Sequence, residues 1–119
     1  MEFKIKELNK EICFVYGFGK SKRIYKLVLT LERGKEISTI HALLSKKLLM
    51  PKDFLNLWKT ILKASATEYF EMEVLPEHSR IYQKLLDIES IKYTKTFDNF
   101  ESHTLIINRN AKINFFKNG

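Results

Sequence analysis

The sequence is poor in cysteine, proline and glycine, with one, two and four of these among its 119 residues. The single Cys13 cannot form an internal disulfide and cannot anchor a metal site built from several cysteines. No apolar run approaches the roughly 20 residues that cross a bilayer. The first twenty residues alternate charged and apolar side chains, which does not fit an apolar signal segment. We therefore expect no membrane contact and a location inside the cell.

The common motifs of catalysis are absent as well, including the Walker loop, the Rossmann glycines, His-Glu-x-x-His and the nucleophile elbow. The three histidines, His41, His78 and His103, lie far apart and lack metal-ligand spacing, so we expect no metal. Each histidine is a candidate base if the fold brings it to a pocket. Glu71 and Glu73 share one strand face and form a candidate acid–base pair, with a solvated strand face as the alternative.

What is present is enough apolar surface for a hydrophobic core. Apolar residues make up 45% of the chain and aromatic residues 13%, which excludes a disordered tail. The length fits one domain of ordinary size. No repeat, low-complexity stretch or linker divides the chain. We expect a single domain over residues 1–108, with residues 109–119 as a tail or an extra strand.

The formal charge of +7 is concentrated in the middle of the chain. Residues 20–63 hold eleven basic and three acidic side chains. Such a block attracts anions, so the sequence predicts an anionic partner: a cofactor phosphate, a nucleic acid or an acidic protein. A solvated lysine-rich surface is the alternative. A nucleic-acid or anion patch that interleaves basic groups with Tyr25 is predicted at Lys20, Lys22, Arg23 and Lys26.

Hydrophobic periodicity predicts strands at residues 3–8, 11–16 and 23–31 with short breaks between them, which is typical of an antiparallel meander. Residues 36–50 fit two interpretations. Ile40, Leu43, Leu44 and Leu48 have helical spacing, whereas alternation from Ile37 to His41 predicts a fourth strand.

The second half of the chain alternates helices and strands. The amphipathic pattern after Pro51 predicts a helix over residues 51–64, because one stripe of it is apolar and the opposite one polar. A strand over 67–75 and a helix over 77–86 follow. A hairpin joins strands at 91–97 and 102–108, the latter expected near a sheet edge where a second copy could pair. The predicted fold is α/β of the α+β kind, with a mixed, mainly antiparallel sheet of six to seven strands and two or three helices.

This order of elements resembles the GCN5-related N-acetyltransferase (GNAT) fold without its first helical excursion. The segment Arg80-Ile81-Tyr82-Gln83-Lys84-Leu85 is similar to the family's Arg-Leu-Tyr-Glu-Lys-Leu-Gly-Phe. In that family the tyrosine can protonate the thiolate of coenzyme A as it leaves. The resemblance therefore implies that Tyr82 is a catalytic acid. The alternative is a ring that packs on the sheet.

A second segment, Arg33-Gly34-Lys35-Glu36-Ile37-Ser38, resembles the family's Arg-Gly-x-Gly-x-Gly/Ala loop, which holds the pyrophosphate of acetyl-CoA. The resemblance implies acetyl-CoA as the cofactor, bound by Arg33, Gly34 and Lys35. If residues 36–43 form a strand instead, the loop before Pro51 takes this role, with Lys46 and Lys47 as its anion-binding residues. A plain β-turn at Gly34 is the alternative.

The functional expectation combines these features. Glu36 stands where the family has a glycine, and a carboxylate there repels a pyrophosphate. The chain thus looks like a divergent GNAT-like protein in which acetyl-CoA-dependent transfer is weakened or lost, similar to phage-encoded GNAT-like proteins of the host cytoplasm or the virion. The alternatives are a basic module that binds nucleic acid or an acidic protein through residues 20–63, and an active acetyltransferase.

Overall fold

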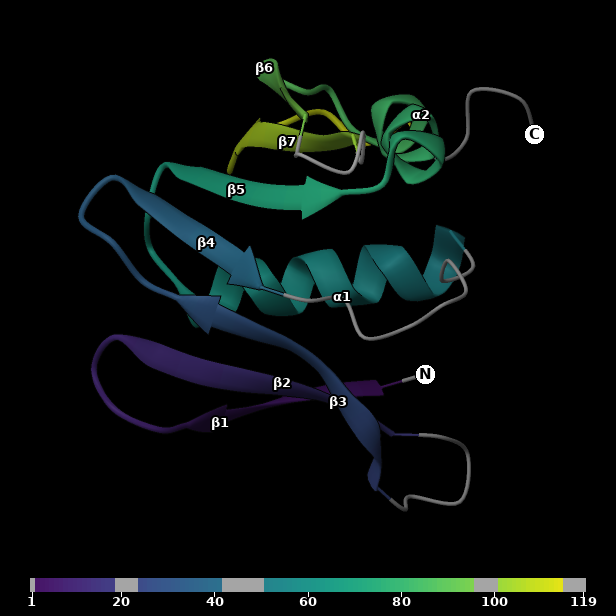
Figure 1. Ribbon diagram of the computed structural model, residues 1–119. Coiled ribbons are helices and arrows are strands. Elements are labelled where there is room, and N and C mark those ends of the chain that lie inside the picture. The colour runs from purple at the N-terminus through teal and green to yellow at the C-terminus, as the bar shows by residue number, and fades with distance from the viewer. Residues whose placement is uncertain (1, 19–23, 42–50, 96–100, 115–119) are drawn as a thin grey trace.

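The computed structural model describes residues 2–18, 24–41, 51–95 and 101–114 (Figure 1). These residues form seven strands and two helices, which confirms the predicted α+β class with a mixed sheet. The elements in chain order are β1 (Glu2–Glu7), β2 (Ile12–Phe18), β3 (Ile24–Glu32), β4 (Ile37–His41), α1 (Pro51–Ala64), β5 (Tyr69–Val74), α2 (Pro76–Leu85), β6 (Ser90–Lys95) and β7 (Glu101–Asn108).

All seven strands belong to one sheet, in the order β1-β2-β3-β4-β5-β7-β6. The first three form the predicted antiparallel meander, β4 continues it, and β6 and β7 form the predicted hairpin. Only β4 and β5 run parallel, paired from Ile37↔Tyr69 to Ile40↔Met72. Parallel neighbours need a crossover connection, and α1 supplies it. The sheet thus consists of two antiparallel parts joined by one short parallel pair.

The ambiguous segment begins as a strand. Ile37–His41 is β4, so the helical interpretation is wrong for these five residues, while residues 42–50 lie outside the described part of the chain. The alternation explains the outcome, since Ser38 and Ile40 are buried while Ile37, Thr39 and His41 are more exposed. β-Branched side chains also suit a pleated surface.

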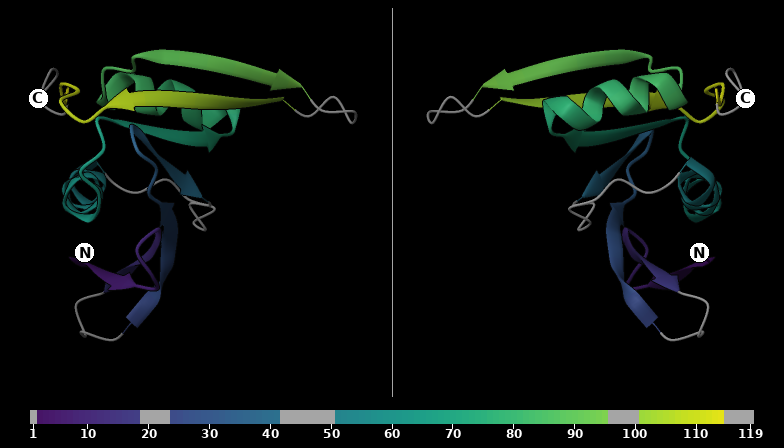
Figure 2. Two further views of the ribbon diagram at one scale, coloured as in Figure 1. Left: turned by 90° about the vertical axis from the view of Figure 1, so that its left-hand side faces the viewer. Right: turned by 90° about the vertical axis from the view of Figure 1, so that its right-hand side faces the viewer.

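Both helices pack on the same face of the sheet. The apolar stripe of α1 is buried against β4 and β5, where Trp58 contacts Phe70 with ring centroids 5.5 Å apart. Tyr82 of α2 contacts Phe54 of α1, which joins the two helices over one core. In Figure 2, α1 lies between β1 and β5, within the curve of the twisted sheet. In the part of the chain that the structure describes, neither helix is long and apolar enough to cross a membrane.

The carboxyl end of α1 is held by two arginines from distant strands. Arg109, just after β7, donates to the carbonyl oxygens of Leu62 (2.7 Å), Ser65 (3.0 Å) and Thr67 (2.9 Å). Arg33, just after β3, donates through Nε to the carbonyl of Ala64 at 2.7 Å. The last carbonyls of a helix have no partner within it and carry partial negative charge. The two guanidinium groups donate hydrogen bonds to these carbonyls and place positive charge beside them.

Beside this helix end, three hydroxyl groups are buried together. Ser38 Oγ lies 2.7 Å from Ser65 Oγ and 2.8 Å from Thr67 Oγ1. Thr67 in turn donates to the carbonyl of Tyr69. Buried hydroxyls must be hydrogen-bonded to offset their desolvation, and these three satisfy one another. They connect β4 to the segment between α1 and β5.

One of the two sheet edges differs from the expectation. Strand β7 lies between β5 and β6, so the prediction that residues 101–108 lie at an edge is wrong, and β6 is the edge strand on that side. The other edge is β1. After β7, residue Ile113 forms an isolated antiparallel bridge with Leu86, and the amide of Asn114 donates to the carbonyl of Leu85. Residues 115–119 lie outside the described part of the chain.

The turn between β3 and β4 yields the first testable prediction. A Cβ at Gly34 would collide with the backbone carbonyl of Ile37. We expect Gly34→Ala to lower the free energy of unfolding by about 1–3 kcal/mol, because backbone has to move to make room. Urea denaturation measures the loss. The exposed neighbour Lys35 is the control, since Lys35→Ala should change stability by less than about 0.5 kcal/mol. Equal stability of the two variants would contradict the close approach.

Candidate functional site

A groove of about 580 Å³ lies on the sheet face opposite the helices, where β4 ends beside β5. Strand β5 continues past the last paired residues, Ile40 and Met72, and pairs onward with β7 alone. The end of β4 therefore leaves a hollow in the sheet surface. The groove is lined by Thr39, Ile40, His41, Glu71, Glu73, Lys92 and Thr104.

Strand alternation and register bring these side chains together. Ile40, Met72 and Leu105 are buried beneath the helices, so their strand neighbours point to the other face. Thr39 lies opposite Glu71 in the pairing of β4 with β5. Thr104 lies opposite both Glu73 on β5 and Lys92 on β6. Four strands thus contribute polar groups to one surface.

Two hydrogen bonds orient the groove's side chains. Thr39 Oγ1 donates to Glu71 Oε1 at 2.9 Å, which leaves the second carboxylate oxygen of Glu71 available. His41 Nε2 lies 2.9 Å from Glu32 Oε2, across the pairing of β3 with β4. Both members of the His41–Glu32 pair are about half exposed, so the pair contributes little to stability. Its effect is to hold the imidazole in place with Nδ1 facing away from the carboxylate.

The remaining charged side chains of the groove are Glu73 and Lys92. Among the described residues, neither Glu73 nor Lys92 has a hydrogen-bond or ion-pair partner. The groove is lined by two carboxylates, on Glu71 and Glu73, with one lysine and one histidine, and a third carboxylate, on Glu32, contacts His41. This excess of negative charge favours a cation such as a protonated amine. No group of three or more metal-ligating side chains occurs in the described ranges.

Tyr82 lies on the other side of the sheet from this groove. Its side chain is 4% exposed, and its ring centroid lies 5.2 Å from that of Phe54 in the core. Burial raises the pKa of Tyr82 to about 12, because the phenolate would lose its hydration. The hydroxyl is therefore protonated at neutral pH, as an acid must be. The ring is buried in the core against Phe54, as the alternative of a packed aromatic side chain expects.

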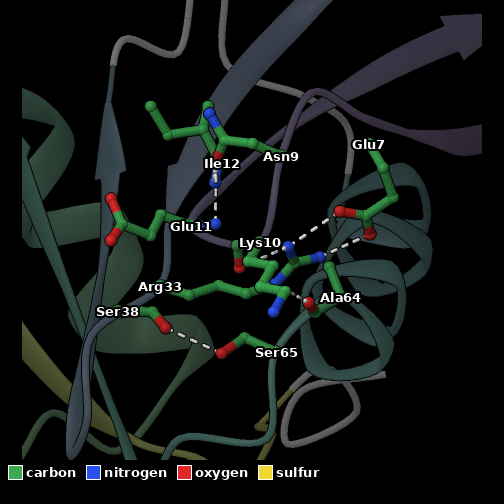
Figure 3. A network of polar contacts seen from close by, with 9 residues as sticks. All are labelled: Glu7, Asn9, Lys10, Glu11, Ile12, Arg33, Ser38, Ala64 and Ser65. Atoms are coloured by element: carbon green, nitrogen blue, oxygen red, sulfur yellow. Dashed lines mark hydrogen bonds and ion pairs between the residues drawn. The ribbon is translucent and has the colours of Figure 1, made fainter.

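Arg33 is occupied by contacts within the protein (Figure 3). Its guanidinium pairs with both carboxylate oxygens of Glu7, at 2.5 and 2.8 Å, and also donates to the carbonyls of Lys10 and Ala64. Four of its five N–H donors are thus engaged. Gly34 makes the tight turn into β4, and Lys35 is exposed. The segment after Arg33 leads into the strand β4, which corresponds to the alternative in which the loop before Pro51, with Lys46 and Lys47, takes the anion-binding role.

The pairing of Glu7 with Arg33 shifts the pKa of both groups. The hydrogen bonds from Arg33 lower the pKa of Glu7, and the same contact raises the pKa of Arg33. Asn9 supports the hairpin beside it, because its Oδ1 accepts hydrogen bonds from the amides of Glu11 and Ile12. The hairpin of β1 and β2 is thereby tied through Arg33 to the end of α1.

The side chains of the other predicted anion-binding residues lie outside the described part of the structure. Lys20, Lys22, Arg23, Lys46 and Lys47 fall in undescribed segments, and Lys26 is described only as part of the β3 backbone. Their assignment stays a prediction.

Sequence reasoning identified His41, Glu71 and Glu73 as candidates but did not bring them together. Glu32, Lys92 and Thr104 were missed. They could be identified only from the strand register, because their position depends on the pairing of β4 with β5 and on the place of β7 inside the sheet. Comparison with protein-family models, curated proteins and solved structures finds no match for this chain.

The Glu7–Arg33 pair predicts a pH-dependent stability. The folded-state pKa of Glu7 is lowered from 4.5, so the pair stabilises the fold above pH 4.5 and loses its effect as pH falls through the lowered value. We expect Glu7→Gln to be less stable than wild type at neutral pH, with the difference closing in acid. Urea midpoints measured from about pH 7 to about pH 2 test this.

The exposed Glu11 lies on the same hairpin and provides the matched control for this pH series. Glu11→Gln should follow the wild-type curve. A difference between Glu7→Gln and wild type that stays constant over the whole pH range would show that the ionised pair is not its source.

Proposed function

We propose that the chain is a divergent GNAT-like domain whose groove binds an amine, with acetyl-CoA-dependent acyl transfer weakened or lost. The observation that carries this proposal is the groove at the end of β4, where a histidine oriented by a carboxylate lies beside two further carboxylates. An amine acceptor needs both a negative site for its ammonium form and a base that removes its proton.

The order of elements supports the resemblance on which the proposal rests. Four strands, a helix, a strand, a helix and a final hairpin occur in the sequence that the resemblance requires. The single parallel pair, with α1 as its crossover, adds a feature that a simple meander does not have. The groove opens directly beside this pair.

Four polar side chains of the groove have a role in this proposal. The carboxylates of Glu71 and Glu73 attract the ammonium group. His41, whose Nε2 faces Glu32, presents Nδ1 as the proton acceptor, because the Nε2–H is then held by the carboxylate. Thr39 holds Glu71 in one orientation. Loss of a proton converts the ammonium into the nucleophile that acyl transfer needs.

Two observations support weakened rather than full acyl transfer. Tyr82, the acid that the resemblance implies, is buried on the face opposite the groove. A general acid must come within hydrogen-bond reach of the leaving group, which burial in the core hinders. Arg33, implied as a cofactor ligand, already uses most of its donors on Glu7 and on backbone carbonyls.

We expect a polyamine to stabilise the protein, because a ligand that binds only the native state raises its melting temperature. Thermal unfolding with increasing spermidine measures this. Glu73→Gln should weaken the affinity about fivefold, the effect of roughly 1 kcal/mol for one charge contact in water. With acetyl-CoA and spermidine together, release of the coenzyme A thiol should be slower than about 1 s⁻¹, below the usual range of enzymes.

The exposed Glu89 lies outside the groove, so Glu89→Gln should bind spermidine as wild type does. Absence of any stabilisation by spermidine would refute the amine site. Thiol release at ordinary enzymatic rates, lost in Tyr82→Phe, would instead identify an active acetyltransferase and refute the weakened chemistry.

A second candidate function rests on the outer surface of α1. Lys52, Lys59 and Lys63 are exposed at helical spacing, opposite the buried stripe. This row belongs to the basic segment 20–63 and suits a polyanionic partner, either a nucleic acid or an acidic protein. Arg33 of the same segment is neutralised by Glu7 and adds nothing to the row.

Salt dependence tests this second candidate. Affinity for a short DNA duplex should fall steeply between about 50 and about 200 mM salt, because bound lysines release counterions. Lys59→Gln with Lys63→Gln should lower the logarithmic salt slope by about 2. The exposed pair Lys84 and Lys112 is the matched control. Equal slopes for the two double variants would exclude α1 as the contact.

A further inference from the structure

The sheet face opposite the two helices carries a row of aromatic side chains along β2. Phe14, Tyr16 and Phe18 alternate with the buried residues of that strand, Cys13 and Val15 among them. They therefore point away from both helices, and each is half-buried. No helix of the described residues lies over them, because α1 and α2 pack on the opposite face. We call these three side chains the aromatic row.

The neighbouring edge strand adds positive charge to this row. Lys6 lies opposite Phe14 and Lys4 opposite Tyr16, and both lysines are exposed. Lys4 also reaches along the strand, with Nζ 5.1 Å from the centroid of the Phe18 ring. Glu2 lies opposite Phe18, so the charge is positive at the middle of the row and mixed at that end.

The rings of Phe14 and Tyr16 meet edge to face and do not stack on each other. The centroids of Phe14 and Tyr16 lie 6.5 Å apart and their planes meet at 63°. Positions two residues apart on a strand are separated by about 7 Å. Stacked bases in a duplex are about 3.4 Å apart, so neighbouring rings of the row cannot each stack on adjacent bases of a duplex. Splayed bases of a single strand can reach successive rings.

We propose that the aromatic row binds single-stranded nucleic acid, with bases stacked on Phe14 and Tyr16 and phosphates held by Lys4 and Lys6. A purely apolar protein partner fits less well, because the strand beside the row exposes lysines where that partner would need apolar contacts. This surface is distinct from the amine groove and from the lysines of α1. It goes beyond the function proposed above and does not depend on it.

The experiment measures fluorescence anisotropy of labelled twelve-nucleotide oligo(dT) and oligo(U), and of a twelve-base-pair duplex, titrated with the full chain. We expect tighter binding of the single strands than of the duplex. The double variant Phe14→Leu with Tyr16→Leu keeps apolar side chains but lacks rings. It should bind oligo(dT) about tenfold more weakly, since each stacked base contributes about 1–3 kcal/mol. Circular dichroism and thermal unfolding verify that this variant folds.

A charge-matched pair of variants locates the contact even if the leucine variant fails to fold. Lys4→Gln with Lys6→Gln should weaken oligo(dT) binding, whereas Lys84→Gln with Lys112→Gln, two exposed lysines outside both β1 and α1, should not. No binding of either oligonucleotide, preference for the duplex, or equal loss from the two lysine variants would overturn the proposal. Self-association of the wild type that is lost in the leucine or the Lys4/Lys6 variant would also overturn it, because a second copy would then occupy the row.

Discussion

The structure depends on how the carboxyl end of α1 is held. That end carries carbonyl oxygens without helical partners, and Arg33 and Arg109 donate to four of the carbonyls in and just beyond it. One arginine follows β3 and the other follows β7, so the two halves of the sheet meet at a single helix terminus. Glu7 neutralises Arg33 and brings the first hairpin to the same place. Planar guanidinium groups suit this task because they present several donors in a fixed geometry.

Because both helices pack on one face of the sheet, the two faces carry different kinds of side chain. The helix-covered face holds one continuous core, from Cys13 on β2 to Ile107 on β7. The other face has an aromatic half over β2 and a polar, mainly acidic half over β4 and β5. A groove for small cations and a platform for planar rings can thus coexist without sharing a residue. The proposed amine site lies in the acidic half of this face and the aromatic row in the other half.

Periodicity predicted most of the elements, because strands and amphipathic helices bury one face at a fixed spacing. The helix over 51–64 matches α1 residue for residue. Local patterns could not predict the place of β7 inside the sheet or the gathering of Glu32, His41 and Glu73, because both depend on pairing between distant strands. Burial of Tyr82 was foreseen only as an alternative. Its helical spacing was compatible with either role, and the position of the ring against Phe54 depends on how α1 and α2 pack together.

The short parallel pair also has a kinetic meaning. Most strand pairings join neighbours in the chain, and that of β5 with β7 crosses the segment that holds α2 and β6. The contact of Thr39 with Glu71 bridges 32 positions and closes a loop that contains all of α1. Loop closure costs entropy before the contacts it permits are formed. We therefore expect the pairing of β4 with β5 to form after the local hairpins and to join the two antiparallel parts of the sheet.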